Sequence, residues 1–337
     1  MKLSRDSIVL LIILFLLSGC TKTNPEWQQE IGISVFTDQE NFLLGWYPES
    51  NDIKDALDID DIGGGYLFYQ SGEREYFTDP PKLMTKASMV FADREEKKGP
   101  LAGVYIGAEM ESITKLYSDI KLSLDNDVPA LIVFIDGFSF EQYITANKGN
   151  QLQFLGEHFR NKALSVYTPV TNAGYAAMIT GTTPNKNGVH NRSYRDMEVE
   201  SIFGYANSKD AKSILLEGDI KILNTEIEPV LHVDTNKNGD TDDEMLSSAL
   251  KALEEGYDLI FVHFHGVDDR GHQYGPMAAE TLDHIKKIDS WITELKDDWQ
   301  GNIYVTADHG MHSTETGGDH GECRYEDMIV PYFSREK

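Results

Sequence analysis

The sequence "ALIVFIDGF", residues 130–138, is a near-continuous apolar run that ends at an acidic residue, Asp136. Two later segments have the same form, "YDLIFVHFHG" at 257–266 and "NIYVTADHG" at 302–310. Strands that are covered on both faces of a parallel sheet are apolar along their whole length. Helical patterns at 243–256 and 278–299 lie between these strands. The alternation predicts an α/β fold, a mostly parallel sheet sandwiched by helices, over residues 128–337.

The segment before residue 128 has a different pattern. Short runs that favour strands are separated by Gly, Pro and charged stretches, and an amphipathic segment at 107–117 predicts a helix. We therefore expect a small N-terminal β-containing module over residues 20–127, whose role the sequence does not indicate. The strand-like runs are "ISVFT" (33–37), "YLFYQ" (66–70), "SMVFA" (88–92) and "AGVYIG" (102–107).

Residues 1–19 have the composition of a signal peptide. Lys2 and Arg5 precede an apolar stretch from Ile8 to Leu17, which is shorter than the ~20 residues that a transmembrane helix needs. Leu-Ser-Gly-Cys resembles a bacterial lipobox, which implies cleavage before Cys20 and acylation of its thiol. We expect a lipoprotein of the cell envelope, anchored to the membrane outside the cytoplasm. A signal peptide without a lipid is the alternative.

The chain carries a formal net charge of −26 and has no basic run. A nucleic-acid polymer is therefore not an expected partner, because binding one requires basic side chains that release counterions from the phosphates. A small anionic substrate would need local positive charge, for which bound metal is a source. Cys323 is the only cysteine besides Cys20, so lipidation of Cys20 leaves no partner for an intramolecular disulfide.

Acidic and histidine residues follow each of the three predicted strands. Asp136 follows the first, Asp268 and His272 follow the second, and Asp308 and His309 follow the third. The carboxyl ends of parallel strands lie at one edge of a sheet, so we expect these side chains to converge. Carboxylates and imidazoles without thiolates suit catalytic zinc, or manganese. One such Asp alone is more often a helix cap, but three clusters together favour a metal site.

The third strand leads into "VTADHGMHSTETGGDHGE", residues 305–322, in which Asp-His-Gly occurs twice. The composition of this run would also fit an ordinary solvated loop. The buried strand immediately before it places the first Asp-His pair at the edge of the sheet, which favours a functional site.

The segment "YTPVTNAGYAAMITGTTPNKNGVHN", residues 167–191, supplies a candidate nucleophile. Small residues from Asn172 predict a helix that closes at Gly181, with Thr171 at its N-terminus, where unpaired N–H groups and the helix dipole favour an anion. Taken alone, Thr171 would more often be an ordinary helix cap. A hydroxyl nucleophile needs a lowered pKa, and metal coordination lowers it without a neighbouring base.

This ordered set of motifs resembles the alkaline phosphatase superfamily and, within it, the type I phosphodiesterase/nucleotide pyrophosphatase branch. The resemblance runs from about residue 128 to 333 and implies an alkaline-phosphatase-like fold. It rests on an apolar strand ending in Asp136-Gly, Thr-Gly-x-x-Pro at 180–184, a relaxed Asp-x-x-Gly-His-x-x-Gly-Pro at 268–276, Asp-His-Gly-Met at 308–311 and a later His320-Gly.

Carried over position by position, the resemblance implies two divalent metal ions, zinc or manganese. One would be held by Asp136, Thr171, Asp308 and His309, and the other by Asp268, His272 and His320. Such a pair can hold the nucleophile and stabilise the departing oxygen of an in-line displacement. Thr171 would form a phosphothreonine.

Asn191 lies near the position of a phosphate-oxygen donor in the family. Outside the motifs, we expect Asp319 to be a turn residue and His312, His263 and His265 to be structural or to support the ligands.

The resemblance implies a small phosphate ester as the substrate and leaves the oligomeric state open. A phosphonoacetate-type C–P hydrolase and a non-catalytic, surface-binding lipoprotein of the same fold are the alternatives. Sulfatases require Cys or Ser in Cys-x-Pro-x-Arg, and the sequence contains no such motif. Relatives usually continue beyond "IVPYFSREK", residues 329–337, so we expect either a short sheet edge there or a sequence that is a truncated product.

The loop "HVDTNKNGDTDDEM", residues 232–245, resembles a calcium-binding loop. Acidic and amide residues run from Asp234 to Asp242, with Gly239 at the sixth place, but Met245 replaces the Glu of the twelfth. Turn residues and acidic caps before a helix would explain the same composition. Calcium therefore stays one of two alternatives.

Overall fold

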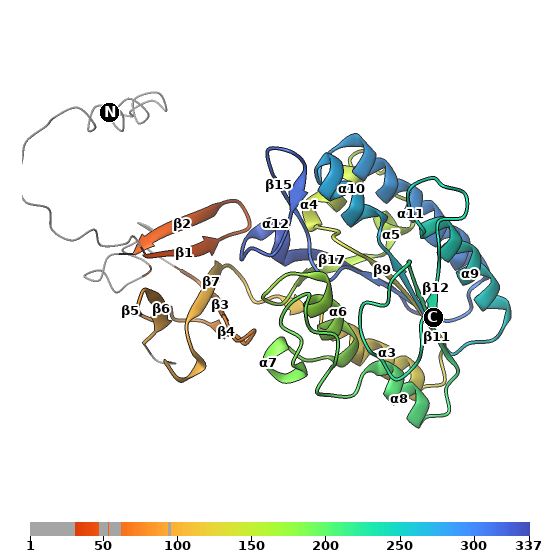
Figure 1. Cartoon of the computed structure of the whole chain (residues 1–337), viewed down its shortest axis with the longest axis horizontal. Helices are drawn as coiled ribbons and strands as arrows, with labels where there is room; N and C mark the ends of the chain where they lie inside the picture. The colour runs from red at the N-terminus through yellow and green to blue at the C-terminus, as the bar shows by residue number, and fades with distance from the viewer. Residues whose placement is uncertain (1–30, 47–52, 54–61, 94–95) are drawn as a thin grey trace, which may run out of the picture. The chain divides into compact units, whose positions relative to one another are not determined.

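The computed structural model describes residues 31–46, 53, 62–93 and 96–337 (Figure 1). The predicted signal peptide and Cys20 lie outside these residues. Within the described ranges, no helix combines the length and the apolar character that crossing a bilayer requires. Residues 31–337 form one compact unit with two main sheets.

The N-terminal sheet has five strands in the order β2-β1-β7-β3-β4, and β5 and β6 form a separate hairpin. Each of the four predicted strand-like runs falls on one of these strands. Their bounds are β1 Ile31–Phe36, β2 Asn41–Trp46, β3 Gly65–Tyr69, β4 Arg74–Phe77, β5 Leu83–Lys86, β6 Met89–Ala92 and β7 Leu101–Ile106, with a 3-10 turn at Glu96–Lys98.

The larger sheet has eight strands in the order β12-β11-β13-β9-β14-β17-β10-β8. The first five are parallel, and β17 pairs antiparallel with both β14 and β10. The three predicted strands are β9 Ala130–Ile135, β13 Leu259–Phe264 and β14 Asn302–Thr306, and all three are almost wholly buried. The remaining bounds are β8 Glu111–Ser112, β10 Phe159–Leu164, β11 Ser213–Glu217, β12 Val230–Leu231 and β17 Ile329–Arg335.

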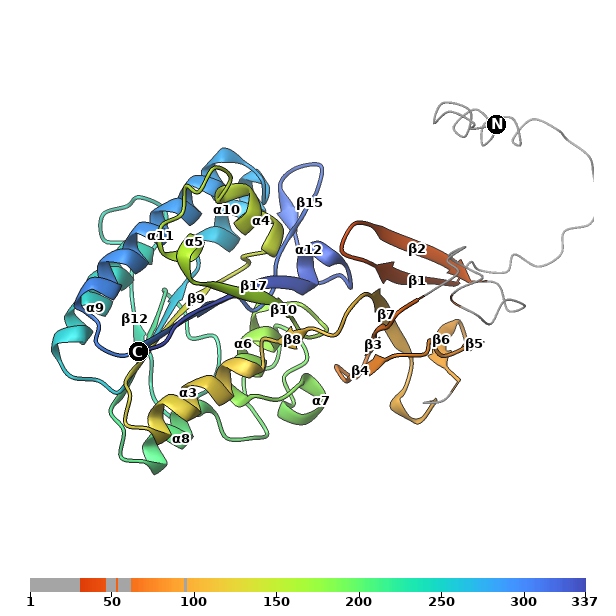
Figure 2. The same ribbon diagram turned by 180° about the vertical axis from the view of Figure 1, so that it is seen from behind.

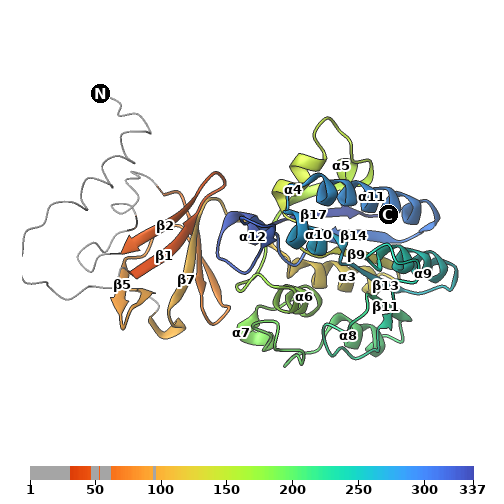
Figure 3. The ribbon, with the colours of Figure 1, turned by 45° about the horizontal axis from the view of Figure 1, so that its top comes forward.

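Helices cover both faces of the large sheet (Figure 3). On one face, α3, α6 and α8 pack against one another, and on the other α11 packs against α4, α5, α9 and α10. This confirms the predicted α/β sandwich, and α9 and α11 match the two predicted helices. The bounds are α3 Lys115–Asp125, α4 Phe140–Ala146, α5 Phe154–His158, α6 Thr171–Thr180, α7 Pro184–Asn187, α8 Ile202–Ser208, α9 Asp242–Glu254, α10 Gly266–Tyr274, α11 Ala279–Asp298 and α12 Tyr325–Met328.

The helix predicted at 107–117 is displaced toward the C-terminus, to α3. Residues 111 and 112 instead form β8, which pairs in parallel with β10 (Figure 2). Ile113, Leu116 and Ile120 are buried in the core of the large sheet, and this packing sets the position of the helix. The last strand of the N-terminal sheet, β7, ends at Ile106, and the next strand, β8 from Glu111, belongs to the large sheet. The chain thus passes from one sheet to the other before residue 127, where we expected the boundary.

The register of the central strands brings their carboxyl ends to one edge. Thr306 of β14 lies opposite Phe134 of β9, and Phe264 of β13 lies opposite Ile135. The residues that follow, Asp136 and Asp308, therefore leave the sheet side by side, as the parallel arrangement predicts.

Candidate metal centre

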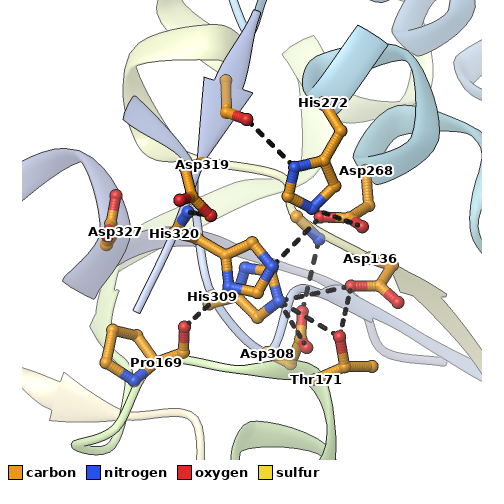
Figure 4. Close-up of polar contacts among 12 residues, drawn as sticks. Asp136, Pro169, Thr171, Asp268, His272, Asp308, His309, Asp319, His320 and Asp327 are labelled. Carbon is orange, nitrogen blue, oxygen red and sulfur yellow. Dashed lines mark hydrogen bonds and ion pairs between the residues drawn. The ribbon is translucent and has the colours of Figure 1, made fainter. Parts of the chain in front are cut away.

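All seven residues expected to hold metal ions lie together at this edge of the sheet (Figure 4). Asp136 follows β9, Asp308 and His309 follow β14, and Thr171 is the first residue of α6. Asp268 and His272 lie on α10, four residues apart, which places them on the same face of that helix. His320 follows β16 (Gly318–Asp319), which forms a two-stranded ribbon with β15 (His312–Ser313).

The first group is centred on the Nε2 atom of His309. This atom lies 3.4 Å from Oδ1 of Asp136, 3.2 Å from Oδ2 of Asp308 and 3.4 Å from Oγ1 of Thr171. Oγ1 of Thr171 lies 3.5 Å from Oδ1 of Asp136. All four side chains are buried, so one hydroxyl, one imidazole and two carboxylates converge on a small polar space.

The second group is centred on the Asp268 carboxylate. Its Oδ2 lies 3.4 Å from Nε2 of His272, and its Oδ1 lies 3.7 Å from Nε2 of His320. Asp268, His309 and His320 also lie close enough together to share an ion, so the two groups meet at His309.

The three histidines present the same nitrogen to the site. In each ring Nδ1 faces a backbone carbonyl oxygen, that of Gly318 for His272 (3.0 Å), of Gly310 for His309 (2.8 Å) and of Pro169 for His320 (2.9 Å). An Nδ1–H that donates to a carbonyl fixes the ring and leaves Nε2 free to bind a metal.

Unsatisfied charge in the cluster fits bound cations. Oδ2 of Asp308 and Oδ1 of Asp268 are buried and make no hydrogen bond. Burial, together with the charges of Asp136 and Asp268, raises the pKa of Asp308 well above its ordinary value. A buried carboxylate beside others is costly unless a cation or a proton compensates it. The donor set of carboxylates, imidazoles and a hydroxyl therefore suits divalent ions such as zinc or manganese.

The histidine protonation states differ within the site. Burial, and to a lesser degree the nearby His320, lowers the pKa of His309 to about 3, so its imidazole is neutral at physiological pH, as a metal ligand must be. The hydrogen bond with Asp268 raises the pKa of His272 to about 9. An ion that binds His272 would therefore displace a proton from it.

Two glycines allow the close packing of the cluster. Gly137 has φ +70° and donates its N–H to Oδ1 of Asp308 (3.3 Å), and a Cβ there would lie 2.8 Å from Oδ1 of Asp268. A Cβ on Gly174 of α6 would lie 2.5 Å from the carbonyl oxygen of Asp308. α6 can therefore bring Thr171 to the carboxylates only because residue 174 has no side chain.

Two of the histidines that lie outside the motifs contact Asp136. Nε2 of His263 lies 3.2 Å from Oδ2 of Asp136, and Nδ1 of His265 lies 3.4 Å from the same oxygen. Burial alone would raise the pKa of Asp136, but the hydrogen bonds from His263 and His265 hold it well below its ordinary value. These contacts keep Asp136 anionic and direct Oδ1 toward Thr171. Asp136, His263 and His265 also lie close enough together to form a group able to hold an ion.

The remaining predicted residues lie apart from the cluster. Asn191 is exposed, and its Oδ1 accepts a hydrogen bond from the N–H of Ser193 (2.9 Å). Asp319 lies in β16 rather than in the turn of the ribbon, and its exposed side chain accepts from the N–H of His320 (2.8 Å). His312 bonds to the buried Asp327 (2.8 Å).

The loop that resembles a calcium site uses its oxygens internally. Asp234 accepts hydrogen bonds from the N–H groups of Asn238 (3.2 Å) and Gly239 (2.9 Å), and Asp240 pairs with Arg270 (2.5 Å). Met245, at the twelfth place, is buried in the core. Among the described residues, none of the three groups able to hold a metal through His, Cys, Asp or Glu side chains includes this loop.

Sequence reasoning missed Arg192. Its guanidinium Nη2 contacts Nε2 of His320, although Arg192 lies next to Asn191 in the chain. The sequence indicates only weakly that Arg192 lies near the cluster, since this residue directly follows the segment 167–191 that contains the candidate nucleophile.

Comparisons with known proteins agree in part with the predicted resemblance. The model of a family described as type I phosphodiesterase / nucleotide pyrophosphatase matches residues 219–329. This segment includes five of the seven predicted ligands, and Asp136 and Thr171 lie before it.

Individual relatives match over short segments. GPI ethanolamine phosphate transferase 1 of Yarrowia lipolytica is 36% identical over 84 residues, which are 23% of this chain and 9% of that protein. Mouse ectonucleotide pyrophosphatase/phosphodiesterase family member 7 is 35% identical over 66 residues, 18% of this chain and 15% of that protein. The matched part thus spans a small fraction of these relatives. A phosphonoacetate hydrolase structure from Sinorhizobium meliloti 1021 superposes with TM-score 0.45 and 19% identity, over 55% of this chain and 57% of that one.

Proposed function

We propose that the protein is a metal-dependent hydrolase of small phosphoric esters, in which Thr171 is the nucleophile and a phosphothreonine is the intermediate. The observation that carries this proposal is the position of the Thr171 hydroxyl. It lies on the first residue of α6, within 3.5 Å of both Asp136 and His309, in a cluster of buried carboxylates and imidazoles. The partial match to the phosphodiesterase family supports it.

Two adjacent groups of side chains would hold the two ions. Asp136, Thr171, Asp308 and His309 would bind one, and Asp268, His272 and His320 the other. When bound, divalent ions lower the pKa of a coordinated hydroxyl and neutralise charge on phosphoryl oxygens. The first N–H groups of a helix have no partner within the helix, so the start of α6 at Thr171 favours an anion. The buried setting excludes bulk water from the carboxylates, which strengthens every charge interaction there.

The Thr171 oxygen would attack phosphorus as the ester oxygen leaves on the opposite side. The hydroxyl of Thr171 would lose its proton to water before the attack, because Nε2 of His309, 3.4 Å away, would itself hold the ion that lowers the pKa of the hydroxyl. Water then releases phosphate from Thr171. An alcohol in place of water would make the protein a phosphotransferase, the activity named for the relative from Yarrowia lipolytica.

A substrate panel tests the proposal. The protein is stripped of metal, reloaded with zinc or manganese, and assayed on p-nitrophenyl phosphate, bis-p-nitrophenyl phosphate, p-nitrophenyl thymidine monophosphate and phosphonoacetate. We expect metal-dependent release of p-nitrophenol from at least one ester. Turnover of phosphonoacetate alone would favour the C–P hydrolase alternative. Metal binding without turnover of any of them would favour a surface-binding lipoprotein.

We further propose that the protein acts in the cell envelope, anchored by a lipid on Cys20. This rests on the lipobox-like sequence that ends at Cys20. Anchoring would place the site outside the cytoplasm, where it could act on small esters that arrive from outside or from the membrane surface.

A further inference from the structure

A cavity of about 420 Å³ lies apart from the metal centre, where the N-terminal sheet meets the start of α3. Its walls come from β4, from β8 with the first turn of α3, and from Gly181, which follows the last residue of α6. Thr171 is at the opposite end of α6, a helix of ten residues and hence about 15 Å long. Of the described residues on the cavity walls, none is a candidate metal ligand.

Arg74 of β4 lines this cavity without an acidic partner. Its Nη1 donates to Oγ of Ser112 (2.6 Å), and no carboxylate among the described residues pairs with its guanidinium. Three other arginines each pair with a carboxylate, namely Arg160, Arg270 and Arg324. Burial lowers the pKa of Arg74 below its ordinary value, because removal from water disfavours the charged form. A guanidinium nevertheless stays protonated at physiological pH, so an anion would stabilise it here.

The start of α3 also lacks an acceptor. The N-cap residue, Thr114, makes no side-chain hydrogen bond to the helix, and the first turn contains no acidic residue. Ser112 is beside it and only 7% exposed, and its Oγ accepts hydrogen bonds from Arg74 and from the N–H of Thr114 (3.2 Å). Both contacts use this oxygen as the acceptor, so the buried hydroxyl proton has no acceptor among the described residues. A guanidinium, a hydroxyl and a helix N-terminus thus offer unused donors to one cavity.

The other charged side chains at the cavity already have partners. Nζ of Lys115 lies 2.9 Å from Oδ1 of Asp119 and 3.9 Å from Oε1 of Glu111. Glu111, the carboxylate on the cavity wall, is half exposed and accepts a hydrogen bond from Asn161 (2.7 Å). Water screens such an exposed carboxylate, so it does not replace a direct partner for Arg74.

We propose that this cavity binds a small oxyanion, either free phosphate or the phosphoryl group of a small monoester. The planar fork of Arg74 matches two oxygens of such a group, and bidentate pairs of this kind are among the stronger hydrogen bonds in proteins. The Ser112 hydroxyl would donate to a third oxygen, and the N-terminus of α3 adds a favourable dipole.

The proposed site gives the N-terminal module a role. Arg74 belongs to the N-terminal sheet, whereas Ser112 belongs to the large sheet and leads into α3 (Figure 2). A bound oxyanion would therefore join the two sheets. This inference does not rest on the proposed hydrolysis, because the site shares no residue with the metal centre.

Binding of inorganic phosphate to the metal-stripped full chain tests the site. Without cations, the carboxylates of the metal centre repel an anion, so binding there is suppressed. Calorimetry would compare the unmutated protein with Arg74→Ala, Arg74→Lys and the control Arg160→Ala, whose guanidinium pairs with Glu336 outside the cavity. We expect one phosphate per chain in the unmutated protein and in the control. Its affinity should fall at least about tenfold in Arg74→Ala and less in Arg74→Lys.

Ser112→Ala provides a second variant, should Arg74→Ala fail to fold, and it should lower phosphate affinity about threefold to tenfold. Phosphate should also raise the Tm of the unmutated metal-free protein, and sodium chloride at equal ionic strength should not. Repeating the titration with glycerol 3-phosphate distinguishes a site for monoesters from one for free phosphate alone. Absence of phosphate binding to the unmutated metal-free chain would overturn the proposal. Affinity within about twofold of the unmutated value in folded Arg74→Ala, or in Ser112→Ala, would also overturn it.

Discussion

The imidazole rings of His309 and His320 are stacked, with 3.7 Å between their centroids and 15° between their planes. These rings come from the two Asp-His-Gly repeats of residues 305–322, and each serves a different proposed ion. Their Nδ1 atoms are held by separate backbone carbonyls, of Gly310 and Pro169. The repeat in the sequence therefore produces two adjacent candidate ligands with independent supports.

Removing either ring should cost one ion. We expect His309→Ala and His320→Ala each to lower the metal content from two ions per chain toward one, because each proposed site loses one of only three or four protein ligands. Elemental analysis of dialysed protein measures this. Asp319→Ala is the matched control, since its exposed carboxylate contacts only the backbone N–H of His320, and it should retain both ions. Unchanged metal content in the His320 variant would show that the second site is assigned to the wrong repeat.

The hydroxyl of Thr171 should be essential for turnover and dispensable for metal binding. Thr171→Ala should lower kcat by at least about a thousandfold, because the nucleophile is gone, while the carboxylate and imidazole ligands remain. Thr171→Ser should retain measurable activity. Trapping of phosphorylated protein by rapid quench, followed by mass spectrometry, should locate the phosphate on Thr171. Near-normal rates in the Ala variant would rule out this nucleophile.

Gly174→Ala should destabilise the protein and displace the nucleophile. The added methyl would lie 2.5 Å from the carbonyl oxygen and 2.7 Å from Cβ of Asp308, so α6 must shift. We expect a loss of about 1 to 3 kcal/mol in the free energy of unfolding, by analogy with other overpacked cores, and reduced kcat. Gly63→Ala, where a Cβ would meet nothing within 4 Å, should be close to neutral in the same urea titrations. Equal stability of both variants would contradict the packing argument.

The stability of the loop that carries His309 and His320 should depend on pH through His312. The hydrogen bond with Asp327 raises the pKa of His312 above its ordinary value, so its stabilisation is present at low pH and is lost as the pH rises through the raised pKa. In metal-free protein, His312→Gln should therefore lose about 1 to 2 kcal/mol more near pH 6 than near pH 9. Asp327→Asn should weaken the same dependence. Parallel stability curves for the unmutated protein and the His312 variant would show that the pair does not titrate in this range.

Removing the proposed lipid anchor on Cys20 should leave the hydrolytic activity unchanged. Cys20→Ser should abolish labelling by a radioactive fatty acid and release the protein from membranes. The described fold and all seven candidate ligands lie far along the chain from Cys20, so specific activity of the purified variant should be unchanged. A lack of fatty-acid incorporation into the unmutated protein would exclude the lipobox interpretation.

The central strands could be predicted because they are buried on both faces and hence apolar throughout. β10 could not, because its residues "FRNKAL" are half polar, and β17 contains Pro331, which ordinarily argues against a paired strand. α10 begins at Gly266 and contains Gly271, which lower helix propensity, so the sequence analysis did not predict a helix there.

The candidate ligands could be predicted because strand ends meet at one edge of a parallel sheet. The approach of Arg192 could not, since it depends on hydrogen bonds from Asn172 to two carbonyl oxygens distant in sequence. The contacts of His263 and His265 with Asp136 likewise depend on the exact register of β13 beside β9. The local sequence pattern thus indicated where the candidate ligands lie. The residues that surround them depend on contacts between segments distant in the chain, which the pattern does not reveal.

The place of β17 between β14 and β10 has a consequence for synthesis on the ribosome. β10 and β8 can join the large sheet only after residues 329–335 have emerged, since β17 alone links them to the other strands. The 165 residues from Leu164 to Ile329 take roughly 10 to 30 s to add at about 5 to 20 residues per second. During that interval β10 lacks its partner β17. Arg160, Asn161 and Lys162 give it polar side chains, which discourage pairing with a neighbouring nascent chain.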